Sequence, residues 1–300
     1  MKYTLLTVLL SIFLMSEGHA EKWKLFYLGG QSNMEGFGKV ADLPDSLKKT
    51  LSDVWIFQST MQNDQAPVNG TGKWVQLQPG HGSGYGWNGS HQYSDKFGME
   101  LTFGRELNRL LPGQKMALIK YPKGGSSLDT NAASTWGCWD PDYRQGNGNN
   151  QYDHFLATLR NGLSVADING DGEPDTLIPA GIIWMQGESD AAFTEEIANR
   201  YQTHLKRMMD LFRASLRTDD LPVVIIRISE SHQHESGKVW KWGDVVREAQ
   251  KRYVESDRHA VLVTTTDSYG YSDPYHYDSP AYLDMGIQAA RAWNSINPSK

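Results

Sequence analysis

A serine that closely follows two glycines could carry a nucleophile. Residues 25–28 are Leu-Phe-Tyr-Leu, and Gly29, Gly30 and then Ser32 come shortly after them. The apolar run predicts a buried strand, and the glycines allow a tight turn. A hydroxyl at the carboxyl end of such a strand lies where open α/β sheets build their sites, with backbone N–H groups nearby to face an oxyanion. The alternative is that Ser32 only caps a short helix.

An aspartate three residues before a histidine could supply the base for this serine. Asp273 and His276 stand in the segment 267–278, near the end of the chain. A carboxylate at this spacing can accept the Nδ1–H of the imidazole, which leaves Nε2 to take a proton from a serine hydroxyl. The chain contains 9 histidines, so a surface position is the alternative for His276.

A second glycine pair, Gly124 and Gly125, follows another apolar run at residues 116–119. If both strands end at the same edge of the sheet, the N–H of Gly125 or Gly124 could donate to an oxyanion beside Ser32. Taken alone, the pair is more simply interpreted as a turn.

Apolar runs and amphipathic stretches alternate along the chain and predict the frame for these residues. The alternation indicates one parallel sheet with helices on both faces. The expected strands are 25–28, 54–57, 116–119, 177–185, 223–226 and 260–263, and the expected helices are 99–111, 154–165, 194–216 and 239–254.

Two long polar segments, 60–95 and 136–150, separate some of these elements and contain Trp87 and Trp136. Flat aromatic rings on loops suit the faces of sugars. We therefore expect both tryptophans to contact a carbohydrate substrate.

Residues 1–20 have the pattern of a secretory signal peptide, with Lys2, an apolar core and small residues before position 21. The core is shorter than the roughly 20 residues of a membrane-spanning helix, and no later run is long enough. We expect residues 21–300 to form a single soluble domain that is secreted or periplasmic, monomeric and not bound to a membrane. The net charge of −6 argues against nucleic-acid binding. The single Cys138 excludes an internal disulfide.

The segment 167–175 carries oxygen side chains at alternate positions around a glycine, which is typical of a calcium-binding loop. Ile178 stands where the usual loop has its last acid, so Asp175 would have to close the site. A solvated acidic turn is the alternative. The expected ligands of a structural Ca²⁺ are Asp167, Asn169, Asp171, Glu173 and Asp175.

Three motifs in chain order carry a resemblance to a known superfamily. They are residues 29–34 (Gly-Gly-Gln-Ser-Asn-Met), 184–190 (Trp-Met-Gln-Gly-Glu-Ser-Asp) and 273–276 (Asp-Pro-Tyr-His). With them the chain resembles the SGNH hydrolases over residues 22–298. More narrowly, it looks like their sialate O-acetylesterase-like branch, which includes acetylxylan esterases. The resemblance implies a flavodoxin-like three-layer α/β/α sandwich with a sheet of about five parallel strands.

The resemblance also implies roles for individual residues. It makes Ser32 the nucleophile, His276 the general base and Asp273 the acid that orients the base. Glu188 is a rival for the place of the acid in this branch. Asn33, next to the nucleophile, is expected to contact the substrate.

The implied oxyanion hole consists of the Ser32 N–H, the Gly125 N–H and the side-chain amide of Gln186. Many acetylxylan esterases of the branch have a histidine where this chain has Met185, which argues against xylan as the substrate. The expected function is therefore an exported carbohydrate O-acetylesterase that forms an acetyl-enzyme and needs no cofactor for catalysis. The alternatives are an esterase for short-chain esters that are not carbohydrates, and an inactive carbohydrate-binding homologue.

Overall fold

The computed structural model describes residues 20–134, 136–144 and 148–297. The predicted signal peptide lies outside these ranges except for Ala20. Within them, no helix combines the length and the apolar composition that crossing a bilayer requires.

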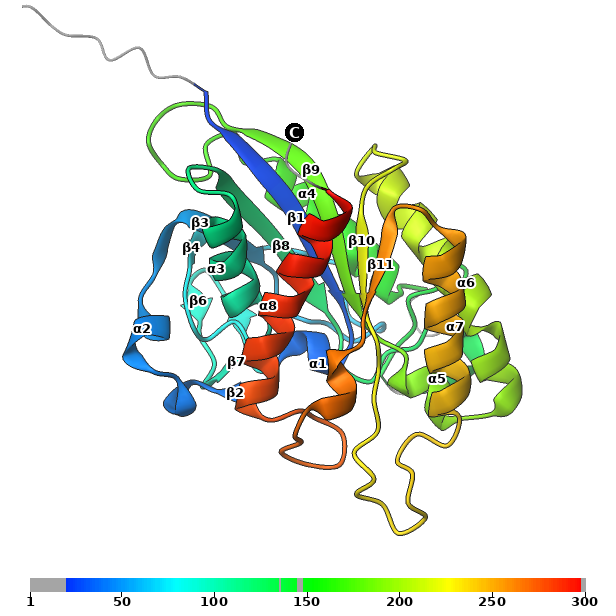
Figure 1. Cartoon of the computed structure of the whole chain (residues 1–300). Coiled ribbons are helices and arrows are strands. Elements are labelled where there is room, and N and C mark those ends of the chain that lie inside the picture. Colours follow the sequence, from blue (N-terminus) through cyan, green and yellow to red (C-terminus); the bar gives the residue numbers. More distant parts are fainter. Residues whose placement is uncertain (1–19, 135, 145–147, 298–300) are drawn as a thin grey trace, which may run out of the picture.

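A seven-stranded sheet forms the centre of the described chain, in the order β11-β10-β9-β1-β8-β3-β4 (Figure 1). Neighbouring strands are parallel except β3 and β4, which are antiparallel. The bounds are β1 Lys22–Gly30, β3 Leu51–Gln58, β4 Val75–Leu77, β8 Lys115–Pro122, β9 Thr176–Met185, β10 Val223–Ile226 and β11 Ala260–Val263.

The parallel α/β sheet predicted from the sequence is confirmed, but it is larger than the five or so strands implied by the resemblance. Strand β4 lies in the segment 60–95, for which the sequence predicted no regular structure. It is only 3 residues long, too short to give a recognisable hydrophobic period. The same segment forms the small antiparallel pair of β5 (Gly86–Trp87) with β6 (His91–Gln92), and a second such pair joins β2 (Gly38–Lys39) to β7 (Lys96–Phe97) outside it.

Helices cover both faces of the sheet, as Figure 1 shows for α3 and α8 on the near face and α6 and α7 to the right. Side chains of β1 alternate between two cores: Leu25 and Tyr27 belong to one, Phe26 and Leu28 to the other. This burial on both faces explains why the strands are continuous apolar runs. The helices are α3 (Glu100–Leu110), α4 (Gln151–Leu163), α6 (Glu195–Ser215), α7 (Gly243–Ser256) and α8 (Ser279–Ile296), with the shorter α1 (Ser32–Glu35), α2 (Asp45–Lys48) and α5 (Glu188–Ala192).

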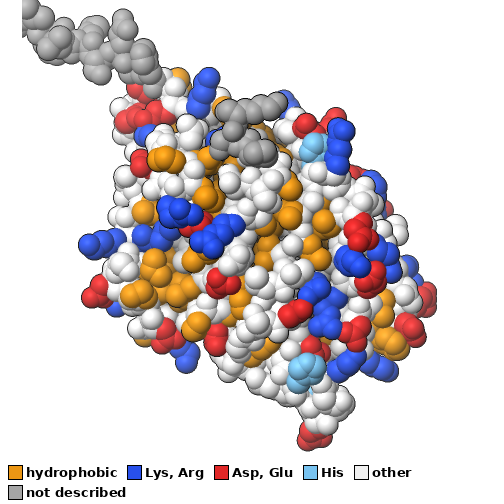
Figure 2. Space-filling view, viewed as in Figure 1, with side chains coloured by type: hydrophobic (Ala, Val, Ile, Leu, Met, Phe, Trp, Pro, Cys, Tyr) orange, Lys and Arg blue, Asp and Glu red, His pale blue; other side chains and the backbone are white. Residues whose placement is uncertain are grey.

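The last helix, α8, was not among the expected elements. Its start carries a recognisable signal, because the Asp278 side chain accepts the N–H of Ala281 at 3.0 Å and Pro280 follows the cap. It packs beside α3, and Trp293 donates its indole N–H to the Ala180 carbonyl at 2.7 Å. Figure 2 shows acidic and basic side chains lying beside one another on this face, so its described residues present no extended field of one sign.

Candidate active site

The three central strands deliver the motif residues to one edge of the sheet. Strand β1 lies between β8 and β9, and parallel strands end on the same side. Ser32 follows β1, the pair Gly124 and Gly125 follows β8, and His276 comes from the loop after β11. These four residues line one cavity of about 690 Å³. The structure therefore brings together the candidate nucleophile, the candidate base and the glycine pair that the sequence singled out.

A turn at Gly30 places Ser32 just after the carboxyl end of β1. Gly30 has φ +144°, and a Cβ there would lie 1.9 Å from the Met185 carbonyl oxygen, so only glycine fits. Gln31 then donates its N–H to the same carbonyl at 2.9 Å. Among the described residues, neither the N–H nor the hydroxyl of Ser32 has a hydrogen-bond partner. Both groups are thus available to a substrate.

His276 is held on two sides. Its Nδ1 lies 2.9 Å from Asp273 Oδ2, and its ring stacks on Phe37 with centroids 3.7 Å apart and an angle of 10°. Burial raises the pKa of Asp273, but hydrogen bonds from His276 and from the Tyr275 N–H outweigh it and leave that pKa below its ordinary value. No bond joins His276 to Ser32 in this conformation; in free enzymes such bonds are often long and tighten only with substrate.

The two glycines at the end of β8 are not equivalent as oxyanion donors. The Gly124 N–H donates to a carboxylate oxygen of Glu35, whereas the Gly125 N–H has no partner among the described residues. Gly125 has φ +72° and faces the cavity beside Trp136. Of the two alternatives from the sequence, the structure therefore favours Gly125.

Gln186 lies apart from this pair. It is fully buried, and its amide nitrogen donates to the Ser126 carbonyl at 3.2 Å and to Asp190 at 2.6 Å. These bonds use both amide hydrogens, and Gln186 is not among the described residues that line the cavity. In this conformation it cannot donate to an oxyanion there, contrary to what the resemblance implied.

Asn33 and Glu188 form a buried bridge behind the cavity. The Asn33 amide nitrogen donates to Glu188 Oε1 at 2.8 Å and to the Tyr275 carbonyl at 3.1 Å, while its oxygen accepts from Tyr282 at 2.7 Å. Asn33 is thus not placed as a substrate contact. Because Asn33 follows Ser32 and Tyr275 precedes His276, the bond between them links the segments that carry Ser32 and His276. Glu188 reaches Asn33, and the carboxylate that reaches His276 is Asp273.

Comparison with known proteins decides the family. The family model described as carbohydrate esterase, sialic acid-specific acetylesterase matches residues 22–295. The chain belongs to this esterase family. A comparison with curated proteins finds no match.

Solved structures share the fold of this esterase. A carbohydrate acetylesterase from Xanthomonas citri is 17% identical with a TM-score of 0.62, over 91% of this chain and 56% of the other. A protein from Arabidopsis thaliana is 18% identical with a TM-score of 0.60, over 92% and 99% of the two chains. NanS is 15% identical with a TM-score of 0.56, over 93% and 97%.

Aromatic side chains form the walls of the esterase cavity. Trp136 lies on the wall and is 55% exposed. Trp87 does not line the cavity: it is half-buried in β5, where its backbone N–H donates to Thr60 at 2.7 Å. The other described wall aromatics, which the sequence analysis did not select, are Phe37, Phe193, Trp240 and Tyr275. Phe193 and Trp240 stand outside the motifs, and Tyr275 lies inside the motif 273–276, where the sequence analysis considered only Asp273 and His276.

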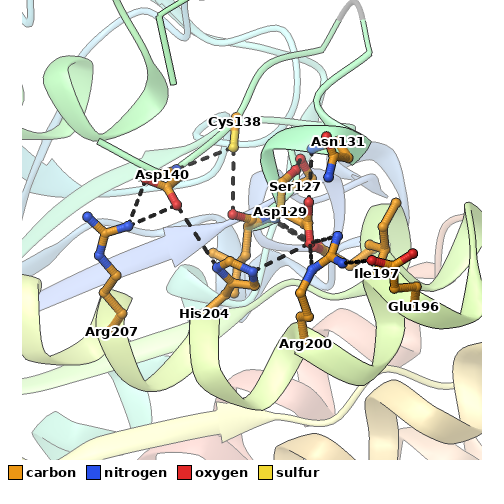
Figure 3. Close-up of polar contacts among 12 residues, drawn as sticks. Ser127, Asp129, Asn131, Cys138, Asp140, Glu196, Ile197, Arg200, His204 and Arg207 are labelled. Atoms are coloured by element: carbon orange, nitrogen blue, oxygen red, sulfur yellow. Dashed lines mark hydrogen bonds and ion pairs between the residues drawn. The ribbon is translucent and has the colours of Figure 1, made fainter. Parts of the chain in front are cut away.

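The segment between β8 and α4, which carries Gly125 and Trp136, is anchored to α6 by charged side chains (Figure 3). The Asp129 carboxylate accepts from Arg200 at 2.8 Å, and Asp140 accepts from Arg207 at 3.0 Å. His204 lies between them, 3.4 Å from Asp129 and 4.0 Å from Asp140. Because both aspartates are buried, these contacts fix one wall of the cavity more firmly than exposed ion pairs would.

Burial raises the pKa of Glu188 to about 7 from an ordinary value of 4.5. The folded esterase therefore binds a proton that the unfolded chain releases, so this group's contribution to stability is present below pH 4.5 and is lost as pH rises towards 7. We expect Glu188→Gln, which removes the titration, to gain up to about 3 kcal/mol over wild type between those pH values. Chemical unfolding across this pH range measures the difference. The exposed control Glu195→Gln should track wild type, and a Glu188→Gln difference independent of pH would contradict the expectation.

The carboxylates of the segment 167–175 do not converge. Asp167 accepts the N–H groups of Gly170, Asp171 and Gly172, and Asp175 accepts from Trp23 at 2.8 Å. Among the described residues, no group of three or more His, Cys, Asp or Glu side chains could hold a metal ion. The alternative interpretation, a solvated acidic turn, fits this arrangement better, and Ca²⁺ binding stays a prediction for experiment.

If the segment 167–175 is a solvated turn, chelation will change the melting temperature of the esterase by no more than about 1 °C, because a ligand stabilises a protein only by binding its folded state. The measurement is thermal unfolding in EDTA and in excess Ca²⁺. A fall of several degrees in EDTA that Ca²⁺ restores, and that Asp171→Asn abolishes, would establish the calcium site instead.

Proposed function

We propose that the protein is an exported carbohydrate O-acetylesterase that uses Ser32 as nucleophile, His276 as general base and Asp273 as the acid that orients the base. One observation carries the proposal. Ser32 and the Asp273-bound His276 line the same cavity, although they lie on opposite ends of the chain. Export through residues 1–20, a monomeric state and catalysis without a cofactor belong to the same proposal.

In the proposed reaction, His276 Nε2 takes the proton of Ser32, and the alkoxide attacks the acetyl carbonyl carbon. The N–H groups of Ser32 and Gly125 donate to the tetrahedral oxyanion. The sugar hydroxyl leaves with the proton from His276, and water then hydrolyses the acetyl-enzyme with His276 again as base.

The walls of the cavity support a sugar substrate. Exposed rings such as Trp136 and Tyr275 suit the apolar face of a pyranose. Lys123 is the one Lys or Arg among the described residues that line the cavity, and an ammonium group there suits a carboxylate. A sialic acid, which the family's description names, has both a pyranose ring and a carboxylate.

Acetate release from a panel of O-acetylated sialic acid, acetylated xylan and chromogenic acetyl and octanoyl esters tests the proposal. We expect release from the acetylated sugars and a preference for acetyl over octanoyl esters. Activity that rises towards octanoyl esters would favour a non-carbohydrate esterase. Glycan binding without acetate release would favour an inactive binding protein.

A further inference from the structure

Glu35 is an acidic residue in the cavity that the proposed reaction does not use. It ends α1, three residues after Ser32, and is 8% exposed. Its own N–H donates to the Gln31 carbonyl at 3.0 Å, which closes the turn that carries Ser32. Burying a carboxylate costs free energy unless it is hydrogen-bonded, so the position of Glu35 beside Ser32 requires an explanation.

The Glu35 carboxylate holds the glycine turn after β8. Its Oε1 accepts the Gly124 N–H, and a Cβ added at Gly124 would lie 2.9 Å from that oxygen and 3.3 Å from Ser32 Cβ. Gly124 is therefore packed between Glu35 and Ser32, where a side chain would not fit without movement.

The hydrogen bonds of this turn leave a single N–H free. Lys123 donates its N–H to Gly30 at 2.9 Å, Gly124 donates to Glu35, and Ser126 donates to the Lys123 carbonyl at 3.3 Å. Among the described residues, Gly125 alone of these four has an N–H without a partner. The bond to Glu35 fixes the peptide plane immediately before this free donor.

The backbone carbonyl of Glu35 is hydrogen-bonded to a buried ion pair between Lys120 and Glu100. The Lys120 ammonium donates to the Glu35 carbonyl at 2.8 Å and to the Glu100 carboxylate at 2.7 Å, and both charged side chains are completely buried. Lys120 lies on β8, the strand that leads into the glycine turn. The backbone carbonyl and the carboxylate of Glu35 are thus both bonded to residues of β8 or the turn that follows it, which ties the segment after Ser32 to the segment that carries Gly125.

We infer that Glu35 is a positioning residue, which orients the Gly124–Gly125 turn so that the Gly125 N–H meets the oxyanion formed on Ser32. This inference rests on the proposed function. It predicts that the hydrogen-bond acceptor at position 35 matters, and that the charge does not.

Three variants separate acceptor from charge. Glu35→Gln keeps an oxygen at the same reach, Glu35→Asp keeps the charge but is one methylene shorter, and Glu35→Ala removes both. We expect Ala and Asp to lower kcat by about tenfold to a hundredfold, less than the loss of a whole oxyanion donor, and Gln to stay within about threefold of wild type. KM should change by less than about twofold, because the lost interaction forms in the transition state. Affinity for a boronic acid that forms a tetrahedral serine adduct should fall by the same factor as kcat.

Amide hydrogen exchange at Gly124 gives a readout that does not need esterase activity. We expect faster exchange in Glu35→Asp and Glu35→Ala and unchanged exchange in Glu35→Gln. Exchange and kcat like wild type in the Asp variant, or losses in Gln equal to those in Asp, would overturn the inference. Failure of the proposed function would look different: wild type would release no acetate while the exchange pattern still held.

Discussion

Ser32→Ala is expected to lower kcat for acetate release by about 10⁵-fold to 10⁶-fold, with the melting temperature unchanged. The loss is large because no acetyl-enzyme can form without the hydroxyl. The donors at Ser32 N–H and Gly125 N–H remain in the variant, so a residual rate of about 10³-fold over the uncatalysed reaction should persist. A steady-state assay with a chromogenic acetyl ester, together with mass spectrometry for the acetylated protein, measures both effects.

Ser83→Ala provides the matched control, because Ser83 lines the same cavity without standing at the end of a strand. Its hydroxyl is expected to be dispensable, with kcat within about fivefold of wild type. Activity retained in Ser32→Ala, or lost equally in both variants, would remove Ser32 from the proposed mechanism.

Asp273→Asn is expected to lower kcat by about 10⁴-fold at neutral pH. The Asp273 carboxylate accepts the His276 Nδ1–H, and an amide that donates at the same place would favour the wrong tautomer of the imidazole. Since hydrogen bonds hold the pKa of Asp273 below its ordinary value, the carboxylate should stay ionised at neutral pH and keep accepting that N–H. Steady-state kinetics of acetate release at neutral pH, wild type against Asp273→Asn, measure the loss.

Glu188→Gln distinguishes the two candidate acids. Glu188 Oε1 accepts from Asn33, and an amide oxygen can accept the same bond, so kcat should stay within about tenfold of wild type. If Glu188→Gln loses more activity than Asp273→Asn, Glu188 is the acid that matters to catalysis and the assignment must be reversed.

The fold and the grouping of the candidate site residues in one cavity were predictable because their signals are local. Each central strand is an apolar run followed at once by its functional residues, and parallel strands must end at one edge, so the meeting of Ser32 with Gly125 followed from chain order. Asp273 and His276 are three residues apart, a distance that one turn closes. Gly30 before Ser32 likewise reflects a backbone geometry that only glycine adopts.

Tertiary structure alone decided which partner each polar side chain takes. The sequence could place Asn33, Gln186 and Glu188 near the site, but the bonds of Asn33 reach residues 155 and 242 positions away, and those of Gln186 reach Ser126, 60 positions away. Trp87 does not line the cavity, because its strand is hydrogen-bonded to Thr60 instead. Glu35 accepts the Gly124 N–H because the end of β8 lies beside it in space. A buried polar group must bond to whatever lies nearest in space, and neighbours in space are set by the packing of distant segments, which no local pattern records.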